Sequence, residues 1–251
     1  MTEPRFIVRP EHLRRYFRKA RGVSPSEMKL PRRGVIVFGG DDRRALDRAF
    51  QAKRLPWYRA LSIGRAGRNR IVVARSPIGA PATAITMEEM AALGVRSFLS
   101  FGACGSLRKD LRIGDVFVPT FAVPDEGTSR FYGRPRRPRP DSTLRDAIVA
   151  ACEHRGIPFR RGGTWTTDAV YRESRSRARS LARQGVAVVD MEASALWAIA
   201  RLRKLRVASL FVVSDELGGD DWLFGFDDPV FRAAKRKALR VVGDVISGSI
   251  G

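Results

Sequence analysis

One short stretch around residue 190 constrains this chain most, because it places two acids between two apolar segments. Residues 186–189 are apolar and predict a buried strand, and residues 193–200 predict a buried helix. Asp190 and Glu192 stand at the junction, where a carboxylate is costly unless something pairs with it. Either acid can accept hydrogen bonds from the first backbone N–H groups of the helix and so cap it. The alternative is a ligand, since a carboxylate can accept two hydrogen bonds from a vicinal diol.

The rest of the chain alternates strand and helix signals, which favours an α/β layered fold. Strands are expected at 35–38, 70–75, 95–101, 116–123, 159–166, 186–189 and 207–213. Helices are expected at 41–50, 81–93, 143–155, 173–184, 193–200 and 229–246. We expect one domain over 34–251, preceded by a basic, irregular arm over 1–33 that packs on a neighbouring subunit. Residues 218–228 are expected to form a functional loop.

The composition narrows the class of protein. The net charge is +21, but the arginines are scattered, and no aromatic residues interleave with the clusters at 134–139 and 172–183. Nucleic-acid binding is therefore not expected. We expect instead a basic surface that attracts small anions. The chain shows neither an apolar run of membrane-spanning length nor the apolar core of a signal peptide. Its two cysteines suggest no disulfide framework, so we expect a cytoplasmic protein.

Four motifs occur in a specific order along the chain. They are VRSFLSFGACGSL at 95–107, read as a strand entering a glycine-rich turn, then LRIGDVFVP at 111–119, VVDMEASALWAIA at 188–200 and FVVSDEL at 211–217. Together they resemble the nucleoside phosphorylase family, which includes uridine phosphorylase and the hexameric purine nucleoside phosphorylases. The resemblance runs from about Gly34 to about Leu217.

This resemblance implies a single-domain, three-layer fold with a central mixed sheet flanked by helices. It implies a nucleoside and inorganic phosphate as substrates, with no metal and no organic cofactor. It also implies a homodimer or a homohexamer, because in this family an arginine reaches the phosphate site of the neighbouring subunit. Arg54 is the best match to that arginine, with Arg59 as the fallback.

The phosphate site implied by the resemblance is only partly present. Gly40 and Arg44 match the family, with Arg43 as an adjacent candidate, and the backbone at Gly102 and Ala103 completes the site. Glycine-rich backbone and a guanidinium fork both suit an oxyanion.

Two groups of that site are missing. Ser100 stands where the family usually has an arginine, and Ala103 stands where it commonly has a serine or threonine. Ser106 is a partial substitute for the lost hydroxyl.

The sugar site implied by the resemblance is better preserved. Glu192 matches the glutamate that accepts from both ribose hydroxyls, and Met191 matches the residue that packs on the ribose. The base is expected to lie beside Cys104, Gly105, Val170, Tyr171 and Asp190.

Asp215 matches the acid that purine-specific members use to protonate the leaving base. Protonation makes chemical sense, because breaking the glycosidic bond leaves negative charge on the base. The alternative for Asp215 is a structural cap at the end of strand 207–213.

Three functions follow from these residues. The first is a nucleoside phosphorylase, with a purine favoured by Asp215 and uridine as the alternative base. The second is a nucleosidase that uses water, suggested by Ser100 and Ala103. The third is a non-catalytic protein that binds a nucleoside or nucleotide. Dependence of turnover on phosphate separates the first two, and any turnover eliminates the third.

Overall fold

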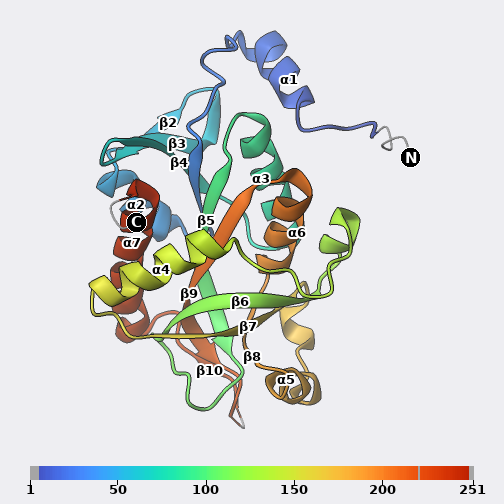
Figure 1. Cartoon of the computed structure of the whole chain (residues 1–251), viewed down its shortest axis with the longest axis vertical. Coiled ribbons are helices and arrows are strands. Elements are labelled where there is room, and N and C mark those ends of the chain that lie inside the picture. The colour runs from blue at the N-terminus through green and yellow to red at the C-terminus, as the bar shows by residue number, and fades with distance from the viewer. Residues whose placement is uncertain (1–5, 220, 249–251) are drawn as a thin grey trace.

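The computed structural model describes residues 6–219 and 221–248, and its regular elements alternate along the chain (Figure 1). The helices are α1 (His12–Arg21), α2 (Gly40–Ala49), α3 (Ala80–Ala92), α4 (Ser142–His154), α5 (Arg175–Ala182), α6 (Ala193–Arg203) and α7 (Pro229–Ser247), with 3-10 turns η1 (Ser129–Tyr132) and η2 (Val170–Arg172). The strands are β1 (Arg33–Val37), β2 (Lys53–Leu55), β3 (Tyr58–Ala66), β4 (Asn69–Arg75), β5 (Ser97–Ser106), β6 (Val116–Asp125), β7 (Phe159–Thr167), β8 (Val186–Asp190), β9 (Arg206–Glu216) and β10 (Leu223–Phe224).

The strands form one mixed, 10-stranded sheet in the order β10-β9-β6-β7-β8-β5-β1-β4-β3-β2. An additional parallel pairing joins β9 to β5, so that β5, β9, β6, β7 and β8 close into a ring. Strand β5 belongs both to this ring and to the open part of the sheet, where it pairs in parallel with β1. The expected α/β fold with a central mixed sheet flanked by helices is confirmed.

Alternation of side chains along the strands divides the core between the two faces of the sheet. Ile36 and Phe98 face α3 and α6, whereas Val35, Val37 and Leu99 face α2, α4 and α7. Figure 1 shows the sheet between these two groups of helices.

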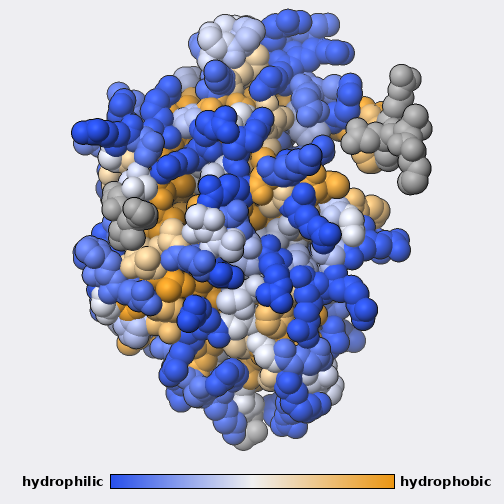
Figure 2. Space-filling model, viewed as in Figure 1, coloured by the Kyte–Doolittle hydropathy of each residue, from blue (hydrophilic) through white to orange (hydrophobic). Residues whose placement is uncertain are grey.

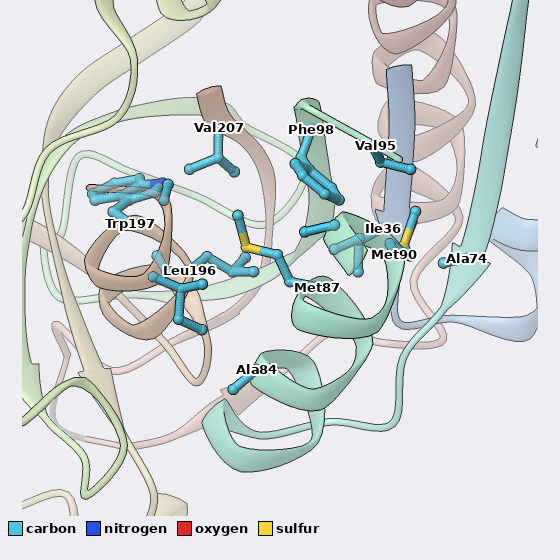
Figure 3. Packing of buried hydrophobic residues seen from close by; sticks show 14 of the residues in the cluster. Ile36, Ala74, Ala84, Met87, Met90, Val95, Phe98, Leu196, Trp197 and Val207 are labelled. Atoms are coloured by element: carbon cyan, nitrogen blue, oxygen red, sulfur yellow. The ribbon is translucent and has the colours of Figure 1, made fainter. Parts of the chain in front are cut away.

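Helix α6 illustrates why the interior is so apolar, since every residue from 193 to 200 is buried. A helix that is buried all round must be apolar all round. Figure 3 shows Met87 of α3 between Phe98 of β5 and the side chains of Leu196 and Trp197 on α6.

Three expectations about local structure are wrong. The first 33 residues are not irregular throughout, because they contain α1, whose Phe17 packs against Trp57 and Tyr58 of the same chain. The glycine-rich segment after residue 101 is not a turn, because it continues strand β5. Strands β2 and β3 appear where no element was expected.

Close packing explains why glycines occur inside β5. A Cβ atom at Gly102 would lie 2.9 Å from the ring of Phe38, and one at Gly105 would lie 2.5 Å from Cδ1 of Leu217. Both distances are shorter than atomic contact allows, so these glycines make room for side chains that follow the ends of β1 and β9 rather than forming a turn. Figure 2 shows that hydrophilic side chains cover much of the face in view, with apolar residues between them. No helix in the described ranges has the length and apolarity that crossing a bilayer requires.

Candidate active site

Two parallel strands, β1 and β4, end at the same edge of the sheet beside the middle of β5, and this arrangement brings the expected phosphate residues together. Register places Val37 of β1 beside Arg75 of β4 on one side and beside Phe101 of β5 on the other. The segments that follow β1 and β4 therefore lie next to the continuing part of β5, which places Gly40, after β1, near Gly102 of β5. Ligands in open α/β sheets commonly bind at such carboxyl ends of strands.

Two guanidinium groups face the start of α2 at this edge. A methyl group at Gly40 would lie 3.5 Å from Nη1 of Arg44 and 3.8 Å from Nη1 of Arg75. Arg44 is exposed and pairs with Asp41. The free N–H groups of a helix start and nearby arginines together make a favourable environment for an oxyanion.

The adjacent candidate Arg43 has a structural role instead. It is buried, and its guanidinium donates to Ser62 Oγ (2.6 Å), to the carbonyl of Ala60 (2.9 Å) and to Asp47 (3.2 Å). These contacts tie α2 to β3 and leave Arg44 as the arginine of this helix that can meet a ligand.

Asp190 caps helix α6 and holds it against β7. Its Oδ2 accepts from the backbone N–H groups of Glu192 (2.8 Å) and Ala193 (2.6 Å). Its Oδ1 accepts from the hydroxyls of Thr164 and Thr166, both at 2.8 Å. All four donors belong to the protein, so the buried carboxylate is satisfied without a ligand. Contact of Asp190 with a base stays a prediction.

Glu192 does not cap the helix that it precedes. Its side chain makes no capping hydrogen bond, and Oε1 instead accepts from the backbone N–H of Gly79 (2.7 Å), just before α3. Burial, reinforced by the neighbouring carboxylate of Asp190, raises the pKa of Glu192 to about 8. A buried carboxyl with spare acceptor capacity is the arrangement that a hydroxyl-bearing ligand requires.

Asp215 lies at the end of β9, between Gly105 of β5 and Phe224 of β10. Its Oδ1 accepts from the hydroxyl of Ser214 (2.6 Å), and its Oδ2 accepts from the indole N–H of Trp222 (2.8 Å). Neither donor is a backbone N–H at a helix start, so these contacts do not make Asp215 a helix cap.

Glu173 brings the segment around η2 to the same region. Burial and the charge of Asp215 raise the pKa of Glu173 to about 7. Val170 and Tyr171, the expected base-stacking residues, lie just before it and are 41% and 89% exposed. They are near enough in the chain to approach a base, but the stacking role stays a prediction.

The thiol of Cys104 on β5 lies close enough to Asp215 and Asp190 to be affected by their charges. Its thiol is buried, and burial, followed by the charges of Asp215 and Asp190, raises its pKa well above the usual value. Burial also raises the pKa of Asp190, against the opposing effect of its hydrogen bonds. The strand ends thus gather the carboxyls of Glu173, Asp190, Glu192 and Asp215 around Cys104 and Gly105.

The acidic and basic parts of the site are joined through one loop. Gly79, which donates to Glu192, follows Arg75 closely at the end of β4. The site therefore places carboxyls beside guanidinium groups, which suits a reaction between a sugar that gains positive charge and an anion. Met191 lies between the two acids of the junction and is partly exposed.

Some expected residues do not join this cluster. Arg54 is exposed on β2, separated from β1 by β4 and β3. Ser100 is 2% exposed and donates to Oγ of Ser209 (2.7 Å), so its hydroxyl is occupied inside the core. Ala103 packs with the cluster on the α4 and α7 face, on the side of β5 opposite to Cys104.

Sequence reasoning missed three contributors, namely Arg75, Gly79 and Trp222. Arg75 had a usable signal, because it ends a strand and parallel strand ends meet at one edge. Gly79 and Trp222 contribute hydrogen bonds to Glu192 and Asp215, and no local sequence pattern predicts these contacts. Within the described ranges, no group of three or more His, Cys, Asp or Glu side chains is arranged to hold a metal ion.

Comparison with known proteins agrees with this geometry. The profile described as the phosphorylase superfamily matches residues 34–247. A guanosine phosphorylase of Halorubrum lacusprofundi is 31% identical over 174 residues, which cover 68% of this chain and 72% of that protein. DeoD-type purine nucleoside phosphorylases of Bacillus cereus and Jannaschia are 30% identical over 59% of this chain, and the matches span 64% and 65% of their lengths.

The fold has a solved counterpart. The crystal structure of purine nucleoside phosphorylase from Toxoplasma gondii in complex with immucillin-H aligns with a TM-score of 0.78. It covers 90% of this chain and 94% of that chain at 21% sequence identity. Because the superfamily profile covers most of the chain and the fold agrees, this protein belongs to the phosphorylase superfamily.

Proposed function

We propose that this protein is a nucleoside phosphorylase that acts on purine ribonucleosides. Inorganic phosphate forms a bond to the anomeric carbon of the ribose, the bond from that carbon to the base nitrogen breaks, and the products are free base and ribose 1-phosphate. The proton that phosphate gives up replaces the one that the leaving base takes from Asp215, so the reaction balances without a metal or an organic cofactor.

One observation carries this proposal, namely the free acceptor capacity of Glu192. Asp190 already caps α6, so the usual structural reason for an acid at this position does not apply to Glu192. Its oxygens are available to accept from the ribose 2′- and 3′-hydroxyls. Binding both hydroxyls would fix the sugar, and the ionised form of Glu192, which grows as the pH rises toward 8, would favour the oxocarbenium-like transition state.

The preference for a purine rests on Asp215 and on the relatives. Asp215 lies beside Gly105 at the end of the expected base site and has side-chain rather than helix-capping contacts. The relatives named above are described as guanosine phosphorylase and purine nucleoside phosphorylases. A proton from Asp215 would neutralise the charge that a departing purine acquires.

The test is a comparison of Glu192→Gln with the unaltered protein. Glutamine keeps the size but cannot ionise, so above pH about 8, where Glu192 is charged, turnover of a purine ribonucleoside should fall by about a hundredfold, the scale of a lost charged hydrogen bond. Thermal unfolding should show that the fold is kept. Near-normal turnover by a folded variant would contradict the proposal.

The same assay separates the nucleosidase alternative, which is favoured by the buried Ser100 and by Ala103, whose side chain packs on the α4 and α7 face. Base release that needs phosphate and yields ribose 1-phosphate supports the phosphorylase. Base release at the same rate without phosphate, with free ribose as the product, would establish the nucleosidase. If no base is released from any nucleoside, the remaining interpretation is a non-catalytic binding protein.

The proposal includes a homodimer or homohexamer with a cytoplasmic location. Arg54 supports the dimer or hexamer. Strand β2 forms the end of the sheet farthest from β10, so this exposed arginine is separated from the phosphate residues of its own chain. In a dimer it would serve a neighbouring site. Light scattering on the purified protein tests this, and a fully active monomer at low concentration would contradict it.

A further inference from the structure

A cavity that opens to solvent lies away from the candidate active site. It has a volume of about 720 Å³ and is lined by residues of α1, of the segment that follows α1, and of the segment between α3 and β5. Gly94 and Arg96 of its lining come just before β5, whereas Gly105 of the active site lies near the end of that strand. The strand has ten residues, so the cavity lies about 30 Å from Gly105. Figure 1 shows α1 at the end of the molecule opposite to β10.

The lining of this cavity is strongly basic. Six cations face a single acid, Glu11, and they are Arg14, Arg15, Arg18, Lys29, Arg32 and Arg96. All six are exposed. Such a concentration of like charge is unfavourable unless an anion is present to offset it.

These cations also lack acidic partners. Among the described residues, none of the six forms a salt bridge, and Arg96 donates only to the carbonyls of Ala91 and Val95. Some arginines elsewhere on the surface do form ion pairs, as in Arg155 with Asp244 and Arg206 with Asp141. The cavity therefore keeps its positive charge free for a ligand.

The floor of the cavity is apolar and firmly held. Pro25, Met28 and Leu30 contribute to the lining, and Met28 and Leu30 are each 3% exposed within the main core cluster. The volume is within the range of sites for small organic ligands, about 300–1,000 Å³.

We propose that this cavity binds a small ligand that carries a chain of phosphate groups, either inorganic or attached to a nucleoside. Guanidinium groups pair with phosphate oxygens in a two-point geometry, and several of them can hold successive phosphates. The site is separate from the one that holds inorganic phosphate in the proposed reaction and does not depend on that proposal.

The shape favours a small ligand over a nucleic acid. The cations line a concave cavity, and none of the residues that line it is aromatic. Single-stranded nucleic acids are usually held in a long groove with aromatic side chains on which the bases stack. An oligonucleotide that binds here more tightly than the small polyphosphates would therefore contradict the proposal.

Calorimetric titration of the full chain at about 0.15 M salt tests it, since this salt screens distant charges. The probes are tripolyphosphate, which carries no base, and ATP. Both should bind with a dissociation constant below about 1 mM, and an excess of inosine, which would occupy the nucleoside site, should not displace either. Tighter binding of ATP would identify a nucleotide as the ligand class, and equal binding would identify the phosphate chain alone.

Two double variants with the same charge change provide the control. Arg14→Glu with Arg18→Glu reverses two cations one helical turn apart on α1, and Arg236→Glu with Arg240→Glu does the same on exposed positions of α7. The first pair should weaken tripolyphosphate binding by at least about tenfold, the effect of losing one charged contact, and the second pair by much less. If the protein with Arg14→Glu and Arg18→Glu does not fold, the milder double variant Arg14→Gln with Arg18→Gln replaces it in the same titration.

The proposal is overturned by any of three results. One is that neither probe binds below about 1 mM. Another is that both double variants weaken binding equally, which would show a general response to net charge. The third is displacement of the probe by inosine, which would place it in the active site.

Discussion

Replacing Asp190 should cost far more stability than activity, because the structure gives it four hydrogen bonds from the protein and none that needs a ligand. Asp190→Ala leaves the N–H groups of Glu192 and Ala193 and the hydroxyls of Thr164 and Thr166 without this acceptor. A buried donor without a partner costs about 1–3 kcal/mol, and the threonine hydroxyls can turn to other acceptors. The burial that raises the pKa of Asp190 offsets part of the loss. We therefore expect the free energy of unfolding to fall by about 3–5 kcal/mol.

Asp190→Asn should lower the free energy of unfolding by less than Asp190→Ala. Its remaining oxygen can still accept from the two backbone N–H groups, and its NH₂ group can donate to a threonine hydroxyl. The expected loss is about 1–2 kcal/mol, close to that of a weakened helix cap. Because this variant keeps the site in place, its KM for a nucleoside should stay close to that of the unaltered protein.

Urea unfolding followed by circular dichroism measures both losses, and an unchanged slope would show that the same transition is compared. Asp41→Ala is the matched control, since Asp41 is an acid in the first turn of α2 whose side chain is 84% exposed. It should cost under about 0.5 kcal/mol. If Asp190→Ala costs no more than this control, or if Asp190→Asn keeps full stability but loses nucleoside binding, the structural assignment of Asp190 is wrong.

Three further predictions concern the proposed chemistry. Asp215→Asn should suppress cleavage of purine nucleosides far more than cleavage of substrates with activated leaving groups, since a base that leaves easily needs no proton; equal losses on both would make Asp215 structural. Because the folded-state pKa of Glu192 is raised to about 8, its contribution to stability is complete below pH about 4.5 and is lost as the pH rises through 8. Melting temperatures between pH 5 and 9 measure this, and the decline should be smaller in Glu192→Gln, where the part below pH about 7 that Glu173 contributes remains. Trp222 donates to Asp215, so a purine nucleoside should change the tryptophan fluorescence; Trp222→Phe should abolish that change and Trp57→Phe should preserve it.

The sequence predicted the strand and helix on either side of residue 190 because both segments are apolar over a length typical of buried elements. It could not decide between capping and ligand binding, since Asp190 and Glu192 are both acids at a helix start. That choice depends on Thr164, Thr166 and Gly79, which come from other parts of the chain.

The segment from Gly102 to Gly105 was interpreted as a turn because glycine commonly marks one. Its conformation is instead determined by Phe38 and Leu217, whose side chains require the space above the strand. Arg75 was overlooked for a related reason, because its place beside Val37 follows from strand register and not from its neighbours in the chain.

Strand β5 pairs with β1, β8 and β9, and residue 97 stands opposite residue 206 in the last of these pairings. During synthesis, β5 leaves the ribosome long before β9 exists, so the active site cannot be completed until the last part of the chain is made. Pairings between distant segments are slow to form, and an unpaired apolar strand is prone to aggregation. A nascent chain that stops before residue 206 would therefore present Phe98 and Leu99 on an open strand edge, as a target for chaperones rather than as a partly active enzyme.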